Sequence, residues 1–465
     1  MYFLFYFGVS LFRFAPSPTG DMHIGNLRAA LFNFIMAKKL GQKFFIRIED
    51  TDLARNIKGK DKQILELLNL FGITYDFLNY QSSNKARHHE VANALLANDL
   101  AFKCYCSKAF LEAKKQEFLE SKRPFRYDDD WTKQNEATCG IDDPTIRLKK
   151  SAKAIEFNDE IKGNVSFQPH ELDSFVILRE DLSPTYNFAC AVDDADFGVN
   201  FIIRGEDHVS NTPRQIMIKD AMNNLRLAPK SDVKYAHLPI ILGSDGKKLS
   251  KRDSSSSVVF LLENGFLPEA IANYLILMGN HTPKEIFTLN EAIAFFDIAK
   301  LSKAPVKFDL NMLRHINREH LKLKDAHFFD THFELKDAKL GELCMHLSQE
   351  FSTLLEIKAA LDLMLAPKDI KSTQDLDNLA NNAKKIHDVI TDLLSQNANL
   401  GSYNDFKISV MAKSGLKGKD FFKPLRVLLT GQSHGIELEL LYPLISHKLS
   451  EIIRLKENRD KEAKE

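Results

Sequence analysis

The arrangement of apolar and polar positions predicts alternating strands and helices along the first hundred residues. Residues 9–15 (VSLFRFA) form a largely apolar run that predicts a buried strand, and residues 26–40 repeat apolar side chains every three or four positions, as one face of a helix does. A second run at residues 43–50 (KFFIRIED) predicts another strand, which ends in carboxylates. Strand, helix and strand in this order are typical of a right-handed parallel unit, so we expect an α/β sheet. Helical patterns follow at residues 60–71 and 85–98.

The pattern changes further along the chain. Residues 104–170 are polar and mixed, and they predict a helix followed by short antiparallel strands, inserted into the α/β domain. Strand patterns resume at residues 173–179 (DSFVILR), whereas from residue 258 onward the patterns are helical, without a convincing strand. Near the end, KGKDFFKPLR predicts a helix start in which Phe421 and Phe422 both belong to the core.

Composition narrows the class of protein. The 465 residues exceed one compact core, so we expect roughly two to four domains. Basic and acidic side chains balance to a net charge of zero, so a nucleic-acid partner would have to bind through local basic patches. The cysteines are few and odd in number, which favours a reducing compartment over a disulfide framework: Cys104, Cys106, Cys139, Cys190 and Cys344.

The apolar start of the chain, MYFLFYFGVSLF, raises the question of a targeting or membrane segment. It lacks the basic leading segment and the cleavage pattern of a signal peptide, and it is too short to cross a bilayer. We interpret it as a lead-in to the first strand, lengthened by an upstream start codon. Since no other segment approaches a membrane span, we expect a cytoplasmic protein without membrane contact.

Residues 13–33 (RFAPSPTGDMHIGNLRAALFN) place glycines, prolines and a histidine between the first strand and the first helix. A turn that opens a helix presents unpaired N–H groups and the positive end of a dipole, which bind anions. Gly20 and Gly25 would leave room for close approach, and His23 could donate a hydrogen bond to a phosphate oxygen. The two common nucleotide motifs, G-x-x-x-x-G-K-[ST] and G-x-G-x-x-G, are absent, so a structural histidine and a phosphate ligand both stay open here.

A second candidate element is the loop SDGKKLSKRDSSSS at residues 244–257. Its cationic side chains suit either a solvated loop or a clamp on phosphates as charge develops during attack at phosphorus: Lys247, Lys248, Lys251 and Arg252. An early histidine turn and a lysine loop after the last strand would meet at the carboxyl edge of one parallel sheet. That is where such folds bind nucleotides.

These motifs together resemble a known family. HIGN (His23–Asn26) resembles the HIGH signature, and KLSKR (Lys248–Arg252) resembles the KMSKS loop of class I aminoacyl-tRNA synthetases. RIEDTD, SPTYNFACAVDD and RGEDHVSNTPRQ are similar to glutamyl-tRNA synthetases in particular, and the likeness continues to KGKDFFKPLRVLLTG near the end. The resemblance implies a Rossmann-type parallel-sheet α/β catalytic domain with an α+β insertion, followed by an all-α anticodon-binding half. The expected domains are a Rossmann domain in two halves (1–103 and 171–242), an acceptor-stem-binding insertion (104–170), a KMSKS-loop and helical stem-contact domain (243–315), and an anticodon-binding domain (316–465).

The resemblance also implies the reaction and the partners. Glutamate would attack ATP to give glutamyl-adenylate and pyrophosphate, and the terminal ribose of tRNA would then take the glutamyl group. The first step usually needs bound tRNA in this family. Mg²⁺ would accompany ATP, as phosphoryl chemistry generally requires. We expect a monomer without an editing domain.

The residue roles follow from the same resemblance. The catalytic residues would be His23, Lys248 and Lys251. The ATP-binding residues would be Gly25, Asn26, Leu242, Lys248, Ser250 and Lys251. The glutamate-binding residues would be Arg13, Ala15, Ser17, Glu49, Tyr186 and Arg204. A dicarboxylic substrate with one ammonium group suits two arginines and one acid in a desolvated pocket, although each could instead belong to a structural ion pair. Cys190 stands where some relatives carry an asparagine.

Some relatives hold zinc in this region of the chain. Cys104-x-Cys106 resembles the first half of that site, but the residues after FRYD offer neither cysteine nor histidine. We therefore expect no zinc and no resident metal.

The choice of tRNA stays open. tRNA-Glu is the family default, but GDMHIGN and RPFRYDDDW resemble a second bacterial paralogue that glutamylates tRNA-Gln for later amidation. Relatives strict for tRNA-Glu often have arginines near residues 363–370, where only Lys368 is basic here. The rival classes are a non-catalytic tRNA-binding paralogue and another α/β nucleotidyltransferase. The first could lose the site residues, and the second would not explain the helical half.

Overall fold

The computed structural model describes residues 11–133, 143–230, 232–243, 245–249, 256–369, 377–398 and 400–456. Two compact units are present: Met1–Phe260 with Ala272–Asp309, and Leu261–Ile271 with Leu310–Glu465. The apolar start of the chain, Ser250, Lys251 and Cys139 lie outside the described residues.

A parallel sheet forms the centre of the first unit. Its first half has the order β1-β2-β3, with all pairs parallel: β1 (Leu11–Phe14), β2 (Lys43–Ile48) and β3 (Phe77–Tyr80). Its second half pairs β9 (Phe201–Gly205) with β10 (Lys234–Leu238), also in parallel. Leu11 forms a parallel bridge with Val199, which brings β1 alongside β9. The expected parallel α/β sheet is therefore confirmed.

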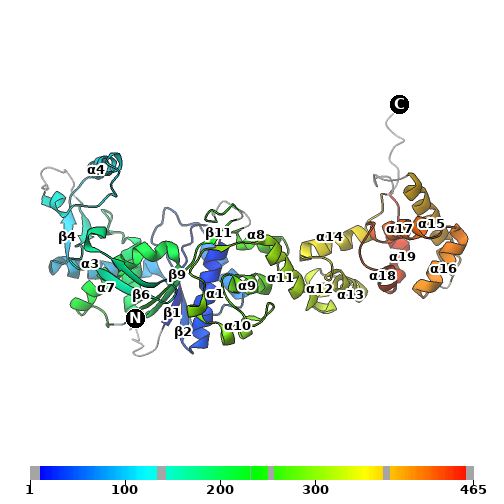
Figure 1. The fold of residues 1–465 in the computed structure, drawn as a ribbon, viewed down its shortest axis with the longest axis horizontal. Coiled ribbons are helices and arrows are strands. Elements are labelled where there is room, and N and C mark those ends of the chain that lie inside the picture. The colour runs from blue at the N-terminus through cyan, green and yellow to red at the C-terminus, as the bar shows by residue number, and fades with distance from the viewer. Residues whose placement is uncertain are drawn as a thin grey trace. The chain divides into compact units, whose positions relative to one another are not determined.

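Helices pack on this sheet as the apolar spacing predicts. Helix α1 (Ile24–Lys39) lies against β1, β2 and β9, as the blue helix in Figure 1 shows. The helical patterns at 60–71 and 85–98 correspond to α2 (Lys60–Leu70) and α3 (Lys85–Ala97). Helices α6 (Tyr186–Asp196) and α7 (Thr212–Asn224) pack against each other and contribute many of the residues of one apolar core cluster.

The segment between the sheet halves contributes strands to two sheets. Strands β4 (Ala101–Cys104), β5 (Thr145–Leu148) and β8 (Phe175–Leu178) form an antiparallel sheet. The hairpin of β6 (Ile155–Asp159) and β7 (Gly163–Phe167) instead extends the central sheet, because β6 pairs in parallel with β10. Helix α4 (Lys108–Glu120) has no buried residue.

The chain then becomes helical, with one exception. After β11 (Ile241–Leu242) come α8 (Val258–Glu263), α9 (Pro268–Leu277) and α10 (Leu289–Phe295). The expectation of no strand after residue 258 is wrong at β12 (Val306–Lys307), which pairs with β11. Two residues are too few to leave a periodic signal in the sequence.

The second unit is built of helices throughout its described residues. They are α11 (Leu310–Lys322), α12 (Ala326–His332), α13 (Ala338–Leu347), α14 (Leu354–Leu365), α15 (Asp377–Ser395), α16 (Tyr403–Ser414), α17 (Lys419–Thr430), α18 (Leu438–Ile445) and α19 (Leu449–Ile452). Phe421 is fully buried, but Phe422 is 40% exposed, so the expectation that both belong to the core is wrong for Phe422. Neighbouring residues on a helix point 100° apart, so only one of the pair can face the core squarely.

No helix in the described part of the chain is both long enough and apolar enough to cross a bilayer.

Candidate active site

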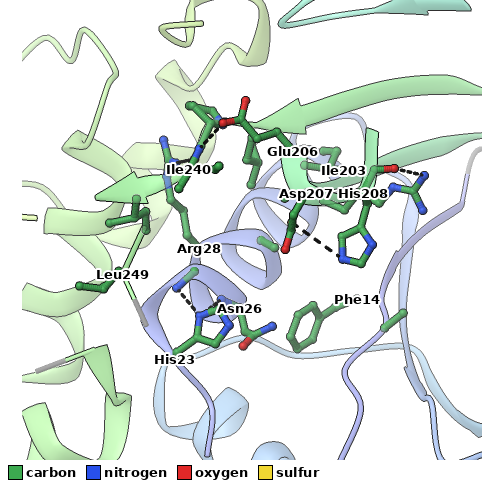
Figure 2. Close-up of a pocket in the computed structure, with 18 of the residues that line it drawn as sticks. Phe14, His23, Asn26, Arg28, Ile203, Glu206, Asp207, His208, Ile240 and Leu249 are labelled. Atoms are coloured by element: carbon green, nitrogen blue, oxygen red, sulfur yellow. Dashed lines mark hydrogen bonds and ion pairs between the residues drawn. The ribbon is translucent and has the colours of Figure 1, made fainter. Parts of the chain in front are cut away.

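A cavity opens at the carboxyl ends of the parallel strands in the first unit (Figure 2). Phe14 ends β1, Gly205 ends β9 and Leu238 ends β10, and all three line it. This edge is where parallel sheets bind ligands, because helix N-termini and loops converge there. Most of the residues expected to bind substrates line the same cavity: Arg13, Ala15, His23, Gly25, Asn26, Glu49, Tyr186, Arg204 and Lys248.

Two expected residues lie elsewhere. Ser17 lines a neighbouring cavity, which shares Glu49 and Tyr186 with the first. Leu242 is not among the described residues that line the first cavity, although its backbone forms an antiparallel β-bridge with that of Lys248.

His23 has a structural task that the sequence alone did not reveal. It is the N-cap of α1, and its Nδ1 accepts hydrogen bonds from the backbone N–H of Gly25 at 3.1 Å and of Asn26 at 3.3 Å. Because Nδ1 accepts, a neutral ring carries its proton on Nε2. A Cβ on residue 25 would lie 2.9 Å from the imidazole, so glycine is required for the ring to fold back over the helix start. The imidazole therefore satisfies helix-mouth amides through Nδ1, and Nε2–H is its only N–H donor.

The described flanks of the lysine loop meet this histidine turn. On one side, Lys248 lines the cavity and its Nζ lies 3.1 Å from Asp207 Oδ2. On the other side, Ser256 lines the cavity, and the N–H of Val258 donates to the carbonyl of Met22 at 3.0 Å. The chain thus enters and leaves the KLSKR segment beside one cavity.

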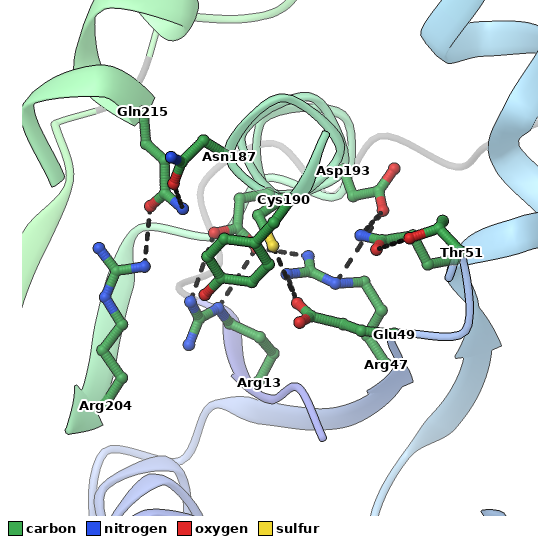
Figure 3. A network of polar contacts seen from close by, with 12 residues as sticks. Arg13, Arg47, Glu49, Thr51, Asn187, Cys190, Asp193, Arg204 and Gln215 are labelled. Carbon is green, nitrogen blue, oxygen red and sulfur yellow. Dashed lines mark hydrogen bonds and ion pairs between the residues drawn. The ribbon is translucent and has the colours of Figure 1, made fainter. Parts of the chain in front are cut away.

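A buried ion cluster supports the pocket wall (Figure 3). Arg47, which is completely buried, donates from Nη1 to Asp194 at 2.6 Å and from Nη2 to Glu49 Oε1 at 3.1 Å. Arg13 also contacts Asp194, at 3.3 Å. Burial alone would raise the pKa of Asp194, but Arg13 and Arg47 hold it well below its usual value. Arg13 is therefore both a cavity-lining residue and a member of an internal ion pair.

Arg204 differs from the other two arginines in its partners. Its guanidinium donates to Gln215 Oε1 and Thr212 Oγ1, each at 2.8 Å, and to His237 Nε2 at 3.2 Å. These acceptors carry no negative charge when His237 is neutral, and no carboxylate among the described residues forms an ion pair with Arg204. A buried cation without a counter-ion is suited to an anionic ligand group.

Glu49 and Tyr186 are held by polar contacts inside the pocket. The Sγ of Cys190 donates to Glu49 Oε1 at 2.9 Å. Burial, with Cys190 and Glu49 nearby, raises the pKa of Tyr186 well above its usual value. Burial also lowers the pKa of His208 to about 4, and its Nδ1 lies 3.2 Å from the Tyr186 hydroxyl. The phenol and the imidazole are thus neutral near pH 7.

Sequence reasoning missed Arg47, Asp194 and Lys219 as parts of this region. A usable signal was present: Arg47 interrupts an apolar strand, and Asp194 and Lys219 occupy otherwise apolar helix faces. Charges at core positions usually indicate partners far along the chain. Lys219 has Asp194 as an electrostatic partner, but its Nζ forms no hydrogen bond among the described residues.

Replacing Lys219 with methionine should stabilise the protein at pH 7. Burial lowers the pKa of Lys219 to about 8, below the unfolded value of about 10.4. The cost of the buried charge is therefore fully present below pH 8 and disappears as the pH rises through the unfolded value. We expect the free energy of unfolding of Lys219→Met to exceed that of the wild type by about 3 kcal/mol at pH 7 and to converge with it near pH 10.5.

The single tryptophan, Trp131, lies in the same unit, so its fluorescence during denaturation follows this unit. The exposed Lys62→Met is the matched control and should change stability little. A Lys219→Met protein less stable than the wild type at pH 7 would contradict the prediction.

The two cysteines of the half zinc motif have another partner. The hydroxyl of Tyr127 lies 3.2 Å from Cys104 Sγ and 3.6 Å from Cys106 Sγ, and the Arg147 guanidinium lies 3.7 Å from the centre of the Tyr127 ring. Within the described residues, no three histidine, cysteine or carboxylate side chains gather in a way that could hold a metal. The absence of zinc stays a prediction.

Comparisons with known proteins agree with this geometry. A family model described as "tRNA synthetases class I (E and Q), catalytic domain" matches residues 11–315, and one described as "Anticodon binding domain" matches residues 295–452. The chain is 53% identical over 446 residues to "Glutamate–tRNA ligase 2" of Helicobacter hepaticus, covering 96% of this chain and all of that one. It is 51% identical over 453 residues to "GlutamylGlutaminyl-tRNA synthetase" of Helicobacter pylori, with the same coverage.

Solved structures match as well. A glutamate–tRNA synthetase from Elizabethkingia anophelis superposes with a TM-score of 0.79 at 25% identity, covering 96% of this chain and 99% of that one. A glutamate tRNA ligase from Elizabethkingia meningosepticum, solved with its amino acid, gives a TM-score of 0.78 at 25% identity, covering 96% and 97%. With a catalytic sheet and a helical half that both match over nearly their whole length, the chain belongs to the glutamate–tRNA ligases, class I synthetases that use ATP to join glutamate to tRNA.

Proposed function

We propose that the cavity at the sheet edge binds ATP and L-glutamate together and forms glutamyl-adenylate there. An oxygen of the glutamate α-carboxylate attacks the α-phosphorus of ATP, the bond to the bridging oxygen breaks, and pyrophosphate leaves. The 2′-hydroxyl of the terminal tRNA ribose then attacks the activated carbonyl carbon, and AMP leaves. The observation that carries this proposal is that imidazole, ammonium, guanidinium and carboxylate groups from separate segments line one cavity.

Arg204 is the residue that we assign to the side-chain carboxylate of glutamate. Its hydrogen bonds go to neutral acceptors, whereas Arg13 already contacts Asp194. A substrate carboxylate would supply the missing counter-charge in a site where water is largely excluded. Glutamine cannot supply it, so the same residue accounts for discrimination against glutamine.

Glu49 is assigned to the substrate ammonium group. Its Oε1 is engaged by Arg47 and Cys190, which fixes the carboxylate plane. Among the described residues no hydrogen bond goes to Oε2, and the side chain lines the cavity. Arg13, Ala15, Ser17 and Tyr186 stay assigned to the glutamate pocket, although Ser17 acts from the adjoining cavity.

The phosphates of ATP would lie between the histidine turn and the lysine loop. His23 would donate from Nε2–H to a phosphate oxygen, and Lys248 and Lys251 would neutralise the departing pyrophosphate. The remaining ATP contacts are assigned to the backbone of the same two segments: Gly25, Asn26, Leu242 and Ser250. Mg²⁺ would arrive bound to the ATP phosphates, because it prefers oxygen ligands and is commonly bound through substrate phosphates.

For the tRNA, we propose that the chain charges tRNA-Gln with glutamate, acting as a monomer. The name of the Helicobacter pylori relative pairs glutamyl with glutaminyl, which supports this choice. The one basic side chain in the segment where strict tRNA-Glu enzymes often carry arginines is also turned inward. Lys368 is 4% exposed, and its Nζ donates to the carbonyls of Met364 and Ala366, each at 2.7 Å. It therefore caps the end of α14 instead of presenting a cation to an anticodon base.

Charging assays with purified tRNA-Gln and tRNA-Glu test both parts of this proposal. We expect ATP–pyrophosphate exchange that depends on tRNA and on glutamate, with glutamine at least about 100-fold poorer because it leaves the Arg204 charge unpaired. We expect a higher kcat/KM for glutamylation of tRNA-Gln than of tRNA-Glu. A strong preference for tRNA-Glu would refute the tRNA-Gln proposal alone, whereas tRNA binding without exchange would support the non-catalytic alternative.

A further inference from the structure

Arg204 is the last member of a buried chain of three hydrogen-bonded side chains, which come from three strands. Asp159 ends β6, His237 lies on β10 and Arg204 lies on β9. His237 and Asp159 are 0% and 1% exposed, and neither lines the cavity. Their Nδ1 and Oδ2 atoms are 2.6 Å apart, and His237 Nε2 lies 3.2 Å from Arg204 Nε. The chain therefore leads from the inserted hairpin to the pocket cation.

The hydrogen bonds define the tautomer of His237. Arg204 Nε–H can only donate, so His237 Nε2 must accept and the ring proton must lie on Nδ1, facing Asp159. Burial lowers the pKa of His237 below its usual value, which keeps the ring singly protonated. Burial alone would raise the pKa of Asp159, but His237 and the backbone N–H groups of Lys162 and Ile161 lower it, so the carboxylate is charged and can only accept.

Asp159 is itself immobilised by the backbone. Its Oδ1 accepts from the N–H of Lys162 at 2.8 Å and of Ile161 at 3.0 Å, in the turn of the β6–β7 hairpin. Its Oδ2 accepts from the backbone N–H of His237 at 3.0 Å as well as from the ring. A carboxylate with four fixed donors cannot rotate without breaking several hydrogen bonds, so it holds the imidazole plane firmly.

We propose that Asp159 and His237 are positioning residues that aim Arg204 at the side-chain carboxylate of glutamate and thereby determine the choice of glutamate over glutamine. This inference rests on the proposed role of Arg204. Gln215 and Thr212 engage the two terminal nitrogens, and His237 is the acceptor for Nε. With all three positions fixed, the guanidinium plane has one orientation.

Variants of the two positioning residues separate this role from a merely structural one. Asp159→Asn presents an amide N–H to His237 Nδ1, which moves the ring proton to Nε2. His237 Nε2–H and Arg204 Nε–H would then both be donors and could no longer form a hydrogen bond with each other. His237→Phe removes the acceptor. We expect each to raise the KM for glutamate about 10- to 100-fold and to lower the glutamate-to-glutamine ratio of kcat/KM, while the KM for ATP changes little. His237→Gln, whose amide oxygen can accept from Arg204, should restore most of the glutamate affinity.

Arg204→Leu distinguishes failure of this inference from failure of the proposed pocket. If Arg204→Leu leaves the KM for glutamate unchanged, the assignment of Arg204 is wrong, and this inference falls with it. If Arg204→Leu raises the KM but folded Asp159→Asn and His237→Phe do not, only the positioning role is overturned. Equal losses for glutamate, glutamine and ATP, with a lower melting temperature and no rescue by His237→Gln, would also overturn it, because they would indicate a structural role.

Discussion

Replacing His23 with asparagine should leave the protein folded but slow adenylate formation about 10²- to 10³-fold, the usual cost of one lost donor to developing charge. Asparagine is a good N-cap, so the start of α1 keeps an acceptor for its amides. What is lost is the Nε2–H donor beside the cavity. The measurement is ATP–pyrophosphate exchange in the presence of tRNA, together with thermal melting.

His23→Ala is the comparison that separates the two tasks of the ring. It should match His23→Asn in exchange rate but melt at a lower temperature, because the cap is worth about 1 kcal/mol. If His23→Asn exchanges at the wild-type rate, the imidazole is a cap only, and its assignment to the phosphates is wrong.

Arg47→Met should destabilise the first unit by about 3–5 kcal/mol at neutral pH, because it leaves the buried Glu49 carboxylate without a cation and leaves Asp194 with Arg13 as its remaining ion-pair partner. The arginines lower the pKa of Asp194 in the folded chain. Their contribution is thus fully present above the unfolded value of about 3.9 and is lost as the pH falls through the lower folded value. The difference between Arg47→Met and the wild type should therefore shrink at acid pH.

Denaturation followed by Trp131 fluorescence at several pH values measures this effect. Arg55→Met is the matched control, since Arg55 pairs with Asp52 at 2.6 Å on the surface and should contribute about 0–1 kcal/mol. A loss for Arg47→Met no larger than that of the control would mean that the cluster does not stabilise the fold.

The parallel sheet and the meeting of the histidine turn with the described flanks of the lysine loop were predictable, because local periodicity and sheet topology determine them. Arg13, Glu49 and Arg204 could be placed near one another for the same reason: Arg13 and Arg204 lie one residue before the end of a strand, and Glu49 directly follows one. Their division of labour could not be predicted. It depends on Asp194, which lies 181 residues from Arg13 along the chain, and its place on an apolar helix face does not tell which arginine it contacts.

The supporting contacts escaped prediction for a related reason. His237 and Asp159 are 78 residues apart and look like ordinary polar residues at strand ends. Phe422 illustrates the opposite case, in which a local apolar pair suggested burial of both rings but the helix turns one outward. Ser17 followed the family motif, yet the turn directs it to the adjoining cavity.

The N-cap role of His23, together with its proposed contact with phosphate, also constrains how this sequence can change over evolution. A descendant that no longer needed to make adenylate would still require a side chain that accepts hydrogen bonds from the amides of the second and third residues of α1, Gly25 and Asn26. It would therefore exchange the histidine for serine, threonine, aspartate or asparagine, and not for an arbitrary residue. Glycine would then no longer be required at position 25, because the imidazole is the only side chain among the described residues that a methyl group there would meet. We therefore expect a descendant that has lost adenylate formation to show substitutions at both position 23 and position 25.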